Sequence, residues 1–169
     1  MNSRLEIAQE AARIVCEEQL TDYRAAKQKA CERLGLHKKS TMPDNAQVQQ
    51  AVLDYQRLFG GRQYLEHLRL MRETAVQAMQ LLADFQPRMV GASISGAVTQ
   101  AHRVQLHVFC EKAEALDIFL HDCKIPFEQG ERSYHYSDGS EAQVPLACFN
   151  AGDVGVDVAA FAQEEINKP

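Results

Sequence analysis

The hydrophobic pattern of this chain changes its period once, at Pro87, and this change limits the folds that it can adopt. Before the proline, apolar residues recur at the three- and four-residue spacings of amphipathic helices. Beyond it, the segment from Val104 to Phe109 alternates apolar with more polar residues, which is typical of a strand buried on one side. The order predicts an α+β fold, with a helical region over residues 1–86 and a mixed β-sheet with helices over residues 87–169.

About four helices are expected in the first half. Their apolar stripes cover roughly residues 5–15, 22–34, 45–59 and 62–85. Gly35 and the Gly60-Gly61 pair follow the second and third stripes, and glycine readily adopts the left-handed conformation that ends a helix. Gln86-Pro87 closes the fourth helix, because the residue before a proline avoids helical geometry.

The second half is expected to combine strands with one clear helix. The predicted order is a strand at 104–109, a helix at 111–123, extended structure from 125, strands at 134–136 and 144–149, and a last strand at 154–161. The segment Ser137-Asp138-Gly139-Ser140 joins the third and fourth of these extended segments, and its composition indicates a hairpin loop.

Composition indicates a folded, soluble chain. Hydrophobic residues make up 46% and charged residues 24% of the sequence, as in globular proteins. No run approaches the ~18 apolar residues of a membrane span, and the charged start offers no signal-peptide core. The five cysteines are odd in number and irregularly spaced, which favours free thiols in a reducing compartment. We therefore expect a cytoplasmic protein that is not inserted in a membrane.

Charge is distributed unevenly along the chain. Residues 1–87 carry 12 Lys/Arg and 11 Asp/Glu, a net charge of +1, whereas residues 88–169 carry 6 and 12, a net charge of −6. A basic stretch near the second helix can attract phosphates or nucleic acid, although a solvated helix surface is the commoner origin of such a pattern. The stretch comprises Arg24, Lys27, Lys29, Arg33, Lys38 and Lys39. Nucleic-acid binding is therefore left open.

Residues 90–109 read VGASISGAVTQAHRVQLHVF. This segment resembles the nucleotidyltransferase (polymerase-beta-like) superfamily, in which a strand, a Gly-Ser turn, a second glycine and a strand bearing Asp-x-Asp follow one another. Gly91 takes the place of the first glycine, Ala92 that of the serine and Gly96 that of the second glycine. The resemblance covers roughly residues 88–161 and implies a nucleotidyltransferase-like fold for the C-terminal half.

The most diagnostic positions of that family are altered in this chain. The two aspartates of Asp-x-Asp fall on Arg103 and Gln105, and Asp157 is the counterpart of the third carboxylate, on a later strand. Enzymes of this kind place two Mg²⁺ ions on the phosphates, and Mg²⁺ requires oxygen ligands. An arginine cannot ligate Mg²⁺ and adds positive charge where the metal would bind. The resemblance therefore implies a degenerate site with neither metal nor other cofactor.

The same strand face can still bind a phosphate without metal. Residues two apart on a strand share a face, so Arg103, Gln105 and His107 are expected together, beside a glycine-rich turn. The candidate ligand-binding residues are Gly91, Ser93, Ser95, Gly96, Arg103, Gln105, His107 and Asp157. A plainer interpretation is that Arg103 and Asp157 form an ion pair across neighbouring strands.

Three functions follow from these patterns. The favoured one is a non-catalytic protein that acts in binding or regulation, with a phosphate, a nucleotide or a partner protein as ligand. One alternative is an active nucleotidyltransferase that holds Mg²⁺ on Asp157 together with Asp153 or Glu111. The other is a structural protein that forms a homodimer through the helix at 62–85.

A zinc site is a weaker hypothesis. His107, Cys110, His121 and Cys123 are ligands of the types that tetrahedral zinc takes. His121 and Cys123 lie two residues apart at the end of a predicted helix, where their side chains diverge. Buried thiols and surface imidazoles are the simpler interpretation.

Overall fold

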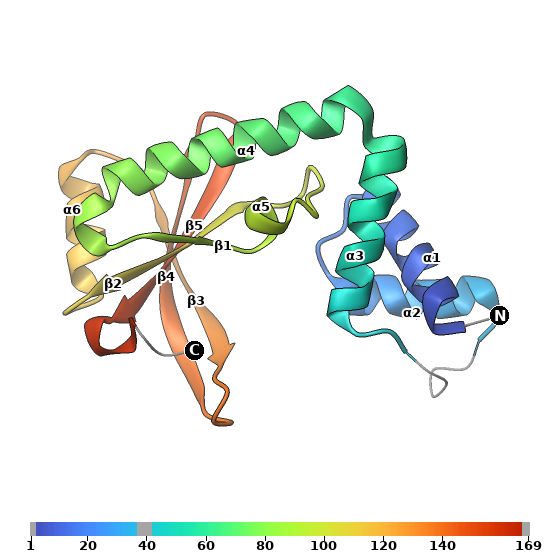
Figure 1. The fold of residues 1–169 in the computed structure, drawn as a ribbon. Helices are drawn as coiled ribbons and strands as arrows, with labels where there is room; N and C mark the ends of the chain where they lie inside the picture. The colour runs from blue at the N-terminus through green and yellow to red at the C-terminus, as the bar shows by residue number, and fades with distance from the viewer. Residues whose placement is uncertain (1–2, 37–41, 167–169) are drawn as a thin grey trace. The chain divides into compact units, whose positions relative to one another are not determined.

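The computed structural model describes residues 3–36 and 42–166, and the chain divides into two compact units (Figure 1). Unit 1 comprises Met1–Arg69 and Ser95–His102, and unit 2 comprises Leu70–Ile94 and Arg103–Pro169. Helices come first and a five-stranded mixed sheet follows, so the predicted α+β class is confirmed. The division into 1–86 and 87–169 stays a prediction.

Unit 1 is helical, and side-chain caps fix the starts of α2 and α3. It contains α1 (Ser3–Glu18), α2 (Tyr23–Leu34), α3 (Asn45–Tyr55), the π-helix η1 (Gln56–Gly60) and the beginning of α4 (Gly61–Leu81). Asp22 accepts hydrogen bonds from two backbone N–H groups at the start of α2, and Asp44 forms a capping box with Gln47 at the start of α3. The third predicted helix continues into the π-helix η1, and α4 begins at the next residue, Gly61.

Small side chains let the helices of unit 1 approach closely. Buried alanines and short aliphatic residues dominate the core, and Ala97 joins it from the segment Ser95–His102. The core residues are Ile7, Ala11, Ala12, Ile14, Val15 and Cys16 of α1, Ala26, Ala30 and Cys31 of α2, Val48 and Val52 of α3, and Ala97.

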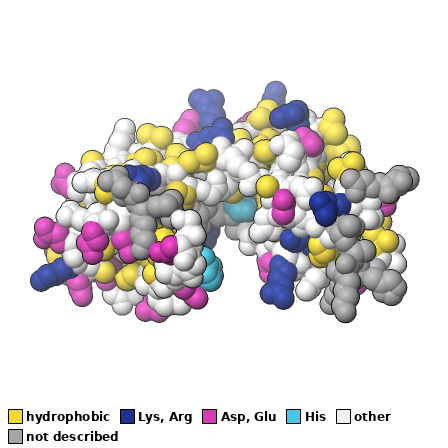
Figure 2. Space-filling view, turned by 60° about the horizontal axis from the view of Figure 1, so that its bottom comes forward, with side chains coloured by type: hydrophobic (Ala, Val, Ile, Leu, Met, Phe, Trp, Pro, Cys, Tyr) yellow, Lys and Arg dark blue, Asp and Glu magenta, His cyan; other side chains and the backbone are white. Residues whose placement is uncertain are grey.

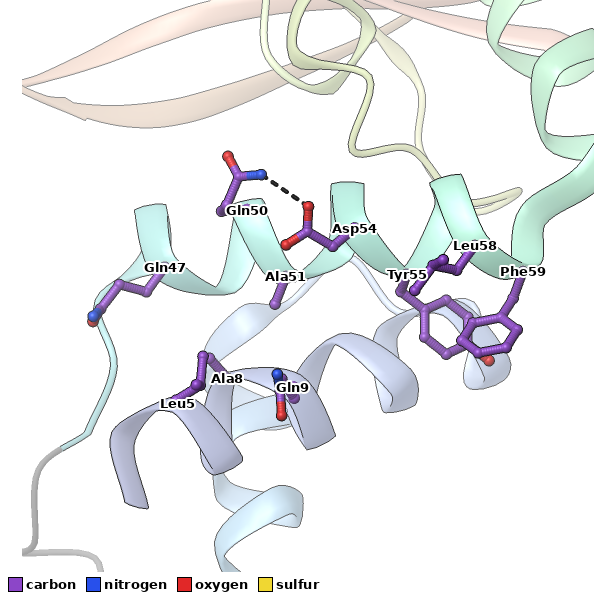
Figure 3. Close-up of a pocket in the computed structure, with 10 residues that line it drawn as sticks. All are labelled: Leu5, Ala8, Gln9, Gln47, Gln50, Ala51, Asp54, Tyr55, Leu58 and Phe59. Atoms are coloured by element: carbon purple, nitrogen blue, oxygen red, sulfur yellow. Dashed lines mark hydrogen bonds between the residues drawn. The ribbon is translucent and has the colours of Figure 1, made fainter. Parts of the chain in front are cut away.

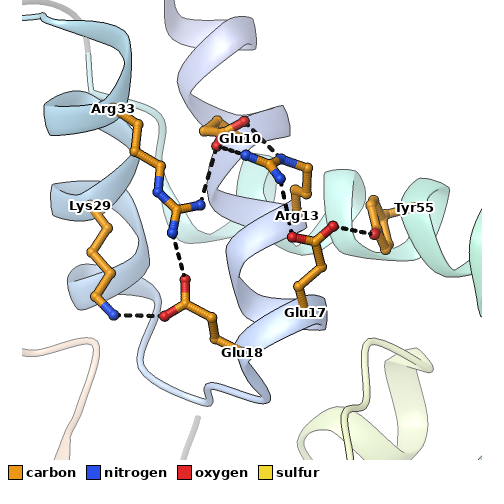
Figure 4. Close-up of polar contacts among 7 residues, drawn as sticks. All are labelled: Glu10, Arg13, Glu17, Glu18, Lys29, Arg33 and Tyr55. Carbon is orange, nitrogen blue, oxygen red and sulfur yellow. Dashed lines mark hydrogen bonds and ion pairs between the residues drawn. The ribbon is translucent and has the colours of Figure 1, made fainter.

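Most of the described cations in the predicted basic stretch have partners within unit 1 (Figure 4). Lys29 pairs with Glu18 at 2.8 Å, and Arg33 pairs with Glu18 at 3.1 Å and with Glu10 at 3.6 Å. Lys27 donates to the carbonyl of Pro43 at 3.2 Å. Lys38 and Lys39 lie outside the described residues. These contacts agree with the interpretation of a solvated helix surface.

The segment Ser95–His102 is fastened to unit 1 by hydrogen bonds from η1 and α4. Gln56 donates to the carbonyl of Val98 at 2.8 Å, and the Tyr64 hydroxyl donates to the carbonyl of Gly96 at 2.7 Å. Gly96 has φ +90°, and a Cβ there would lie 3.3 Å from the Tyr64 hydroxyl oxygen. Both the positive φ and the close approach require glycine at this position.

Unit 2 contains the sheet, in the order β1-β2-β5-β4-β3. Its strands are β1 (Arg88–Val90), β2 (Val104–Cys110), β3 (Glu128–His135), β4 (Glu141–Ala151) and β5 (Val154–Ala162). β2 and β5 pair in parallel, and the other neighbours pair antiparallel. The predicted hairpin is confirmed, because β3 and β4 pair on either side of the turn at 137–140.

Unit 2 also contains helices, of which α4 and α6 carry buried apolar side chains. They are the second part of α4, the short 3₁₀ helix η2 (Ala83–Phe85), α5 (Ala92–Ser95, whose last residue belongs to unit 1) and α6 (Glu114–Asp122). Val104, Leu106 and Val108 of β2 are fully buried, as predicted from the alternation. A final 3₁₀ helix, η3 (Gln163–Glu165), follows β5. No helix in the described residues is long and apolar enough to span a bilayer.

Candidate functional site

The eight residues predicted to bind a ligand are divided between the two units. Ser95 and Gly96 belong to unit 1, and the other six belong to unit 2. Within unit 2, register aligns three of them on one side of the sheet: Gln105 lies opposite Asp157 on β5, and His107 follows Gln105 at strand spacing. We call this side the Asp157 face. Gly91 lies in the turn after β1, with φ +80°, and a Cβ there would lie 3.4 Å from Cγ of Gln105.

The two serines do not present free hydroxyls to a ligand. Ser93 is only 1% exposed, and its hydroxyl has no hydrogen-bond partner. Its carbonyl and that of Ile94 accept hydrogen bonds from the Arg72 guanidinium at 2.7 and 2.9 Å. The Ser95 hydroxyl accepts from the backbone N–H of Ala97 at 3.2 Å. In this conformation the serine turn has a structural role.

Asp157 is the centre of the Asp157 face, and its carboxylate is held from several directions. Arg103 donates through Nε to Oδ1 at 2.8 Å, and Gln105 donates through Nε2 to Oδ2 at 3.1 Å. Arg132 of β3 reaches the same Oδ2 at 3.5 Å and also donates to Oε1 of Gln105. We call these four residues the arginine-aspartate cluster. The predicted ion pair between Arg103 and Asp157 is confirmed.

Gly155 makes room for the Arg103 side chain. A Cβ at this position would lie 2.1 Å from Nη1 and 2.3 Å from Cζ of Arg103. The guanidinium therefore lies directly against the glycine backbone, where Nη2 also donates to the carbonyl of Phe149 at 3.2 Å. Only a residue without a side chain allows this approach.

The environment keeps Asp157 ionised. Its burial raises the pKa of the carboxyl group, but hydrogen bonds from Arg103, Gln105 and the Cys148 thiol lower it, and the net effect is a pKa below the usual value. In turn, burial and the bond to Asp157 raise the pKa of the Cys148 thiol. Cys148 is therefore a protonated hydrogen-bond donor and not a nucleophile.

The cluster carries more positive than negative charge toward solvent. The side chain of Asp157 is 8% exposed, whereas those of Arg103 and Arg132 are each 39% exposed. Two guanidinium groups thus meet one buried carboxylate. Acidic side chains are numerous on the visible surface of unit 2, at the left of Figure 2, so this positive site is a local exception.

An aromatic cavity of about 250 Å³ lies on the same face, next to the cluster. The rings of His107, Tyr134 and Phe161 form part of its wall and pack against one another, with centroid separations between 4.7 and 5.3 Å. The Arg88 guanidinium lies over the ring of Phe109, 5.0 Å from its centroid. Burial first, and then the charges of Arg132 and Arg88, lower the pKa of His107, so its imidazole is neutral at pH 7.

The other acidic residues proposed to share a metal ion with Asp157 lie far along the strands. Asp153 occupies the turn before β5, and Glu111 follows the far end of β2. At about 3.3 Å per strand residue, these positions lie about 13 and 20 Å from Asp157, whereas ligands of one Mg²⁺ lie within about 4 Å of each other. No group of three or more His, Cys, Asp or Glu side chains in the described parts of the chain is placed to hold a metal.

The residues of the zinc hypothesis do not converge either. His107 and Cys110 are an odd number of residues apart on β2, so they lie on opposite faces of the sheet. His121 is an exposed residue of α6, and Cys123 is the exposed residue that ends it.

Unit 1 has a separate groove between α1 and α3, with a volume of about 460 Å³ (Figure 3). Ala8 and Ala51 lie between the two helices, and the side chains of Leu58 and Phe59 project from the π-helix at one end. Leu58 is 74% exposed and Phe59 is 70% exposed. Most of the exposed surface of the groove is apolar, and among the described residues its polar lining comes from Asp54 and the glutamines Gln9, Gln47 and Gln50.

Comparisons with protein-family models, with curated proteins and with solved structures find no match to this chain. The geometry of the site therefore carries the functional inference. Sequence reasoning identified Arg103, Gln105, His107 and Asp157 but missed Arg132 and Gly155. The alternation of Arg132 and Tyr134 on a strand was a usable signal for the first, whereas the need for Gly155 depends on a contact with a distant side chain.

Proposed function

We propose that the chain is a non-catalytic protein of nucleotidyltransferase-like fold, acting in binding or regulation, and that its Asp157 face binds a phosphate-bearing ligand. The observation that carries the proposal is the arrangement of Arg103 and Arg132 around one buried carboxylate. Asp157 fixes both guanidinium groups, so little side-chain entropy remains to be lost when an anion binds. The unused N–H donors of both arginines suit phosphate oxygens.

The pairing of β2 with β5 also supports this proposal. It sets Asp157 opposite Gln105, which is the relation expected of the third carboxylate and an Asp-x-Asp position in the family that the sequence resembles. With Arg103 and Gln105 in place of the two aspartates, the site has a guanidinium group where the enzymes of that family bind metal. Anion binding without Mg²⁺ follows from this exchange.

The test is calorimetry and thermal shift with inorganic phosphate, pyrophosphate and ATP, each with EDTA or with Mg²⁺. We expect binding in EDTA and no requirement for Mg²⁺. A ligand at 100 times its dissociation constant adds about 2.7 kcal/mol of stability, which thermal shift detects. Arg132→Gln should weaken binding several-fold while keeping the Arg103–Asp157 pair. Arg57→Gln, which removes an exposed cation of unit 1, is the matched control.

Two results would overturn the proposal. Absence of binding for all three anions at millimolar concentration would remove the ligand site. Mg²⁺-dependent transfer of label from a nucleotide would instead favour the alternative of an active transferase, and loss of that transfer in Asp157→Ala would then assign the catalytic carboxylate.

Self-association is the second candidate function, and exposed apolar side chains favour it. On α4, Leu65 is 63% exposed and Leu70 and Val76 are each 47% exposed. Exposed apolar side chains on a long helix are one feature of interaction surfaces. Light scattering at micromolar concentration tests it: a dimer that Leu65→Lys dissociates supports a homodimeric structural protein, and a monomer rules it out.

A further inference from the structure

The Asp157 face has two chemically different parts, the arginine-aspartate cluster and the aromatic cavity. Its lining combines aromatic rings from β2, β3 and β5 with Arg88 and Val90 of β1 and with Glu165. A cavity of about 150 Å³ with an apolar lining is large enough for benzene, so 250 Å³ accommodates one planar ring and a substituent. The volume is too small for a drug-sized molecule.

The cavity and the arginine-aspartate cluster are joined by adjacent positions of one strand. Arg132 and Tyr134 are two residues apart on β3 and share a face, about 7 Å from each other. The charge of Arg132 helps to lower the pKa of His107, so Arg132 also lies near this residue of β2. A ring in the cavity therefore places a directly attached anionic group within reach of Arg132.

The charges around the cavity set the direction in which such a ligand lies. At one end Glu165 accepts a hydrogen bond from the Tyr136 hydroxyl at 2.9 Å, so a carboxylate is already there. Arg88 also lines the cavity, and both Arg88 and Arg132 are close enough to act on the His107 imidazole. An anionic group is repelled by Glu165 and attracted by these guanidinium groups, so it lies away from Glu165.

We propose that the Asp157 face selects anions that carry a planar aromatic ring, with the ring in the aromatic cavity and the anionic group on Arg132 and Arg103. The position of the anion rests on the proposed function, and the preference for a ring is the new element. Edge-to-face contacts with Tyr134 and Phe161 stabilise the ring beyond the area that it buries.

The experiment compares phenyl phosphate with methyl phosphate by calorimetry on the full chain. We expect phenyl phosphate to bind about tenfold more tightly, the ratio that corresponds to one favourable ring contact. Val90→Phe, which fills the cavity with an apolar side chain, should reduce the affinity for phenyl phosphate to that for methyl phosphate and leave the latter unchanged. Tyr134→Leu should act in the same direction, and a thermal melt of each variant establishes that it is folded.

The outcomes separate this inference from the proposed function. Equal affinities of the two phosphates in the unmodified protein would overturn the ring preference while leaving the anion site in place. Binding of neither phosphate would overturn both. Tighter binding of phenyl phosphate that persists in folded Val90→Phe and Tyr134→Leu would place the ring elsewhere and overturn the assignment of the cavity.

Discussion

The two units use their cations in different ways. In unit 1, Lys29 and Arg33 pair with acidic residues on neighbouring helices at the surface, where water screens both partners. In unit 2, Arg103 and Arg132 converge on one buried carboxylate and keep part of their surface exposed. Three of the described cations in the basic stretch, Lys27, Lys29 and Arg33, thus have partners within unit 1, whereas two arginines 29 positions apart in an acidic half form the positive site. Local charge density in a sequence is a poor guide to where an anion binds.

Loss of Arg103 should produce the largest effect, because it leaves the buried Asp157 without its closest partner. Removing one member of a buried ion pair costs about 3–5 kcal/mol. Since Arg132 and Gln105 remain in contact with Asp157, we expect Arg103→Ala to lower the free energy of unfolding by about 3 kcal/mol. Urea denaturation measures this loss. If the free energy of unfolding fell no more than it does when a surface ion pair of unit 1 is removed, the contrast between the units would be contradicted.

Gly155→Ala tests how Arg103 is held. The added Cβ would meet the guanidinium, so Arg103 has to move away from Asp157, and we expect a loss of about 2 kcal/mol. Gly130→Ala is the matched control on β3, because a Cβ there would lie 3.8 Å from Cβ of Leu146, an ordinary contact. The control should be neutral or slightly stabilising. Equal effects of the two substitutions would contradict a specific role for Gly155.

The lowered pKa of Asp157 predicts a particular dependence on pH. A carboxyl group whose pKa is lower in the folded than in the unfolded state stabilises the fold above its unfolded pKa, about 3.9 for aspartate. This contribution is lost as the pH falls from there through the folded pKa. The difference in unfolding free energy between the unmodified protein and Asp157→Asn should therefore be constant near neutrality and shrink below about pH 4. A constant difference down to pH 2 would show that ionisation is irrelevant.

Glu18→Gln should have the smallest effect. It removes the partner of both Lys29 and Arg33, yet all three side chains are substantially exposed. Exposed ion pairs contribute little and are weakened by salt. We expect a change in the denaturation midpoint close to experimental scatter, which disappears in molar salt. A large loss that survives salt would remove the distinction between the surface pairs and the cluster.

The sequence predicted what depends on local patterns. Alternation correctly placed the side chains of β2, and the composition of residues 137–140 marked the hairpin between β3 and β4. The ion pair of Arg103 with Asp157 followed from expecting their strands to be neighbours. The first two features involve a period or a turn that a short window of residues contains, whereas the ion pair joins residues 54 positions apart and depended on the resemblance.

Features that depend on distant contacts were missed. The contact of the Tyr64 hydroxyl with Gly96 was not predicted, and the role of Gly96 in a ligand-binding turn stays a prediction. The third helix continues as a π-helix at Gln56–Gly60, and nothing in the apolar spacing distinguishes this from an ordinary helix end. The place of Arg132 depends on the register of β3 and β4, which a single strand does not encode.

The attachment of Ser95–His102 to unit 1 has a consequence for how the chain is made and divided. The core of the N-terminal helices includes Ala97, and Gln56 and Tyr64 find their acceptors in this segment. During synthesis the helical unit therefore remains incomplete until residue 102 has left the ribosome, after β1 has already emerged. Neither unit is one uninterrupted stretch of chain, so a cut at Pro87 would leave residues of both units on each fragment. The first unit is therefore complete only after residues 70–94 of the second unit have been synthesised.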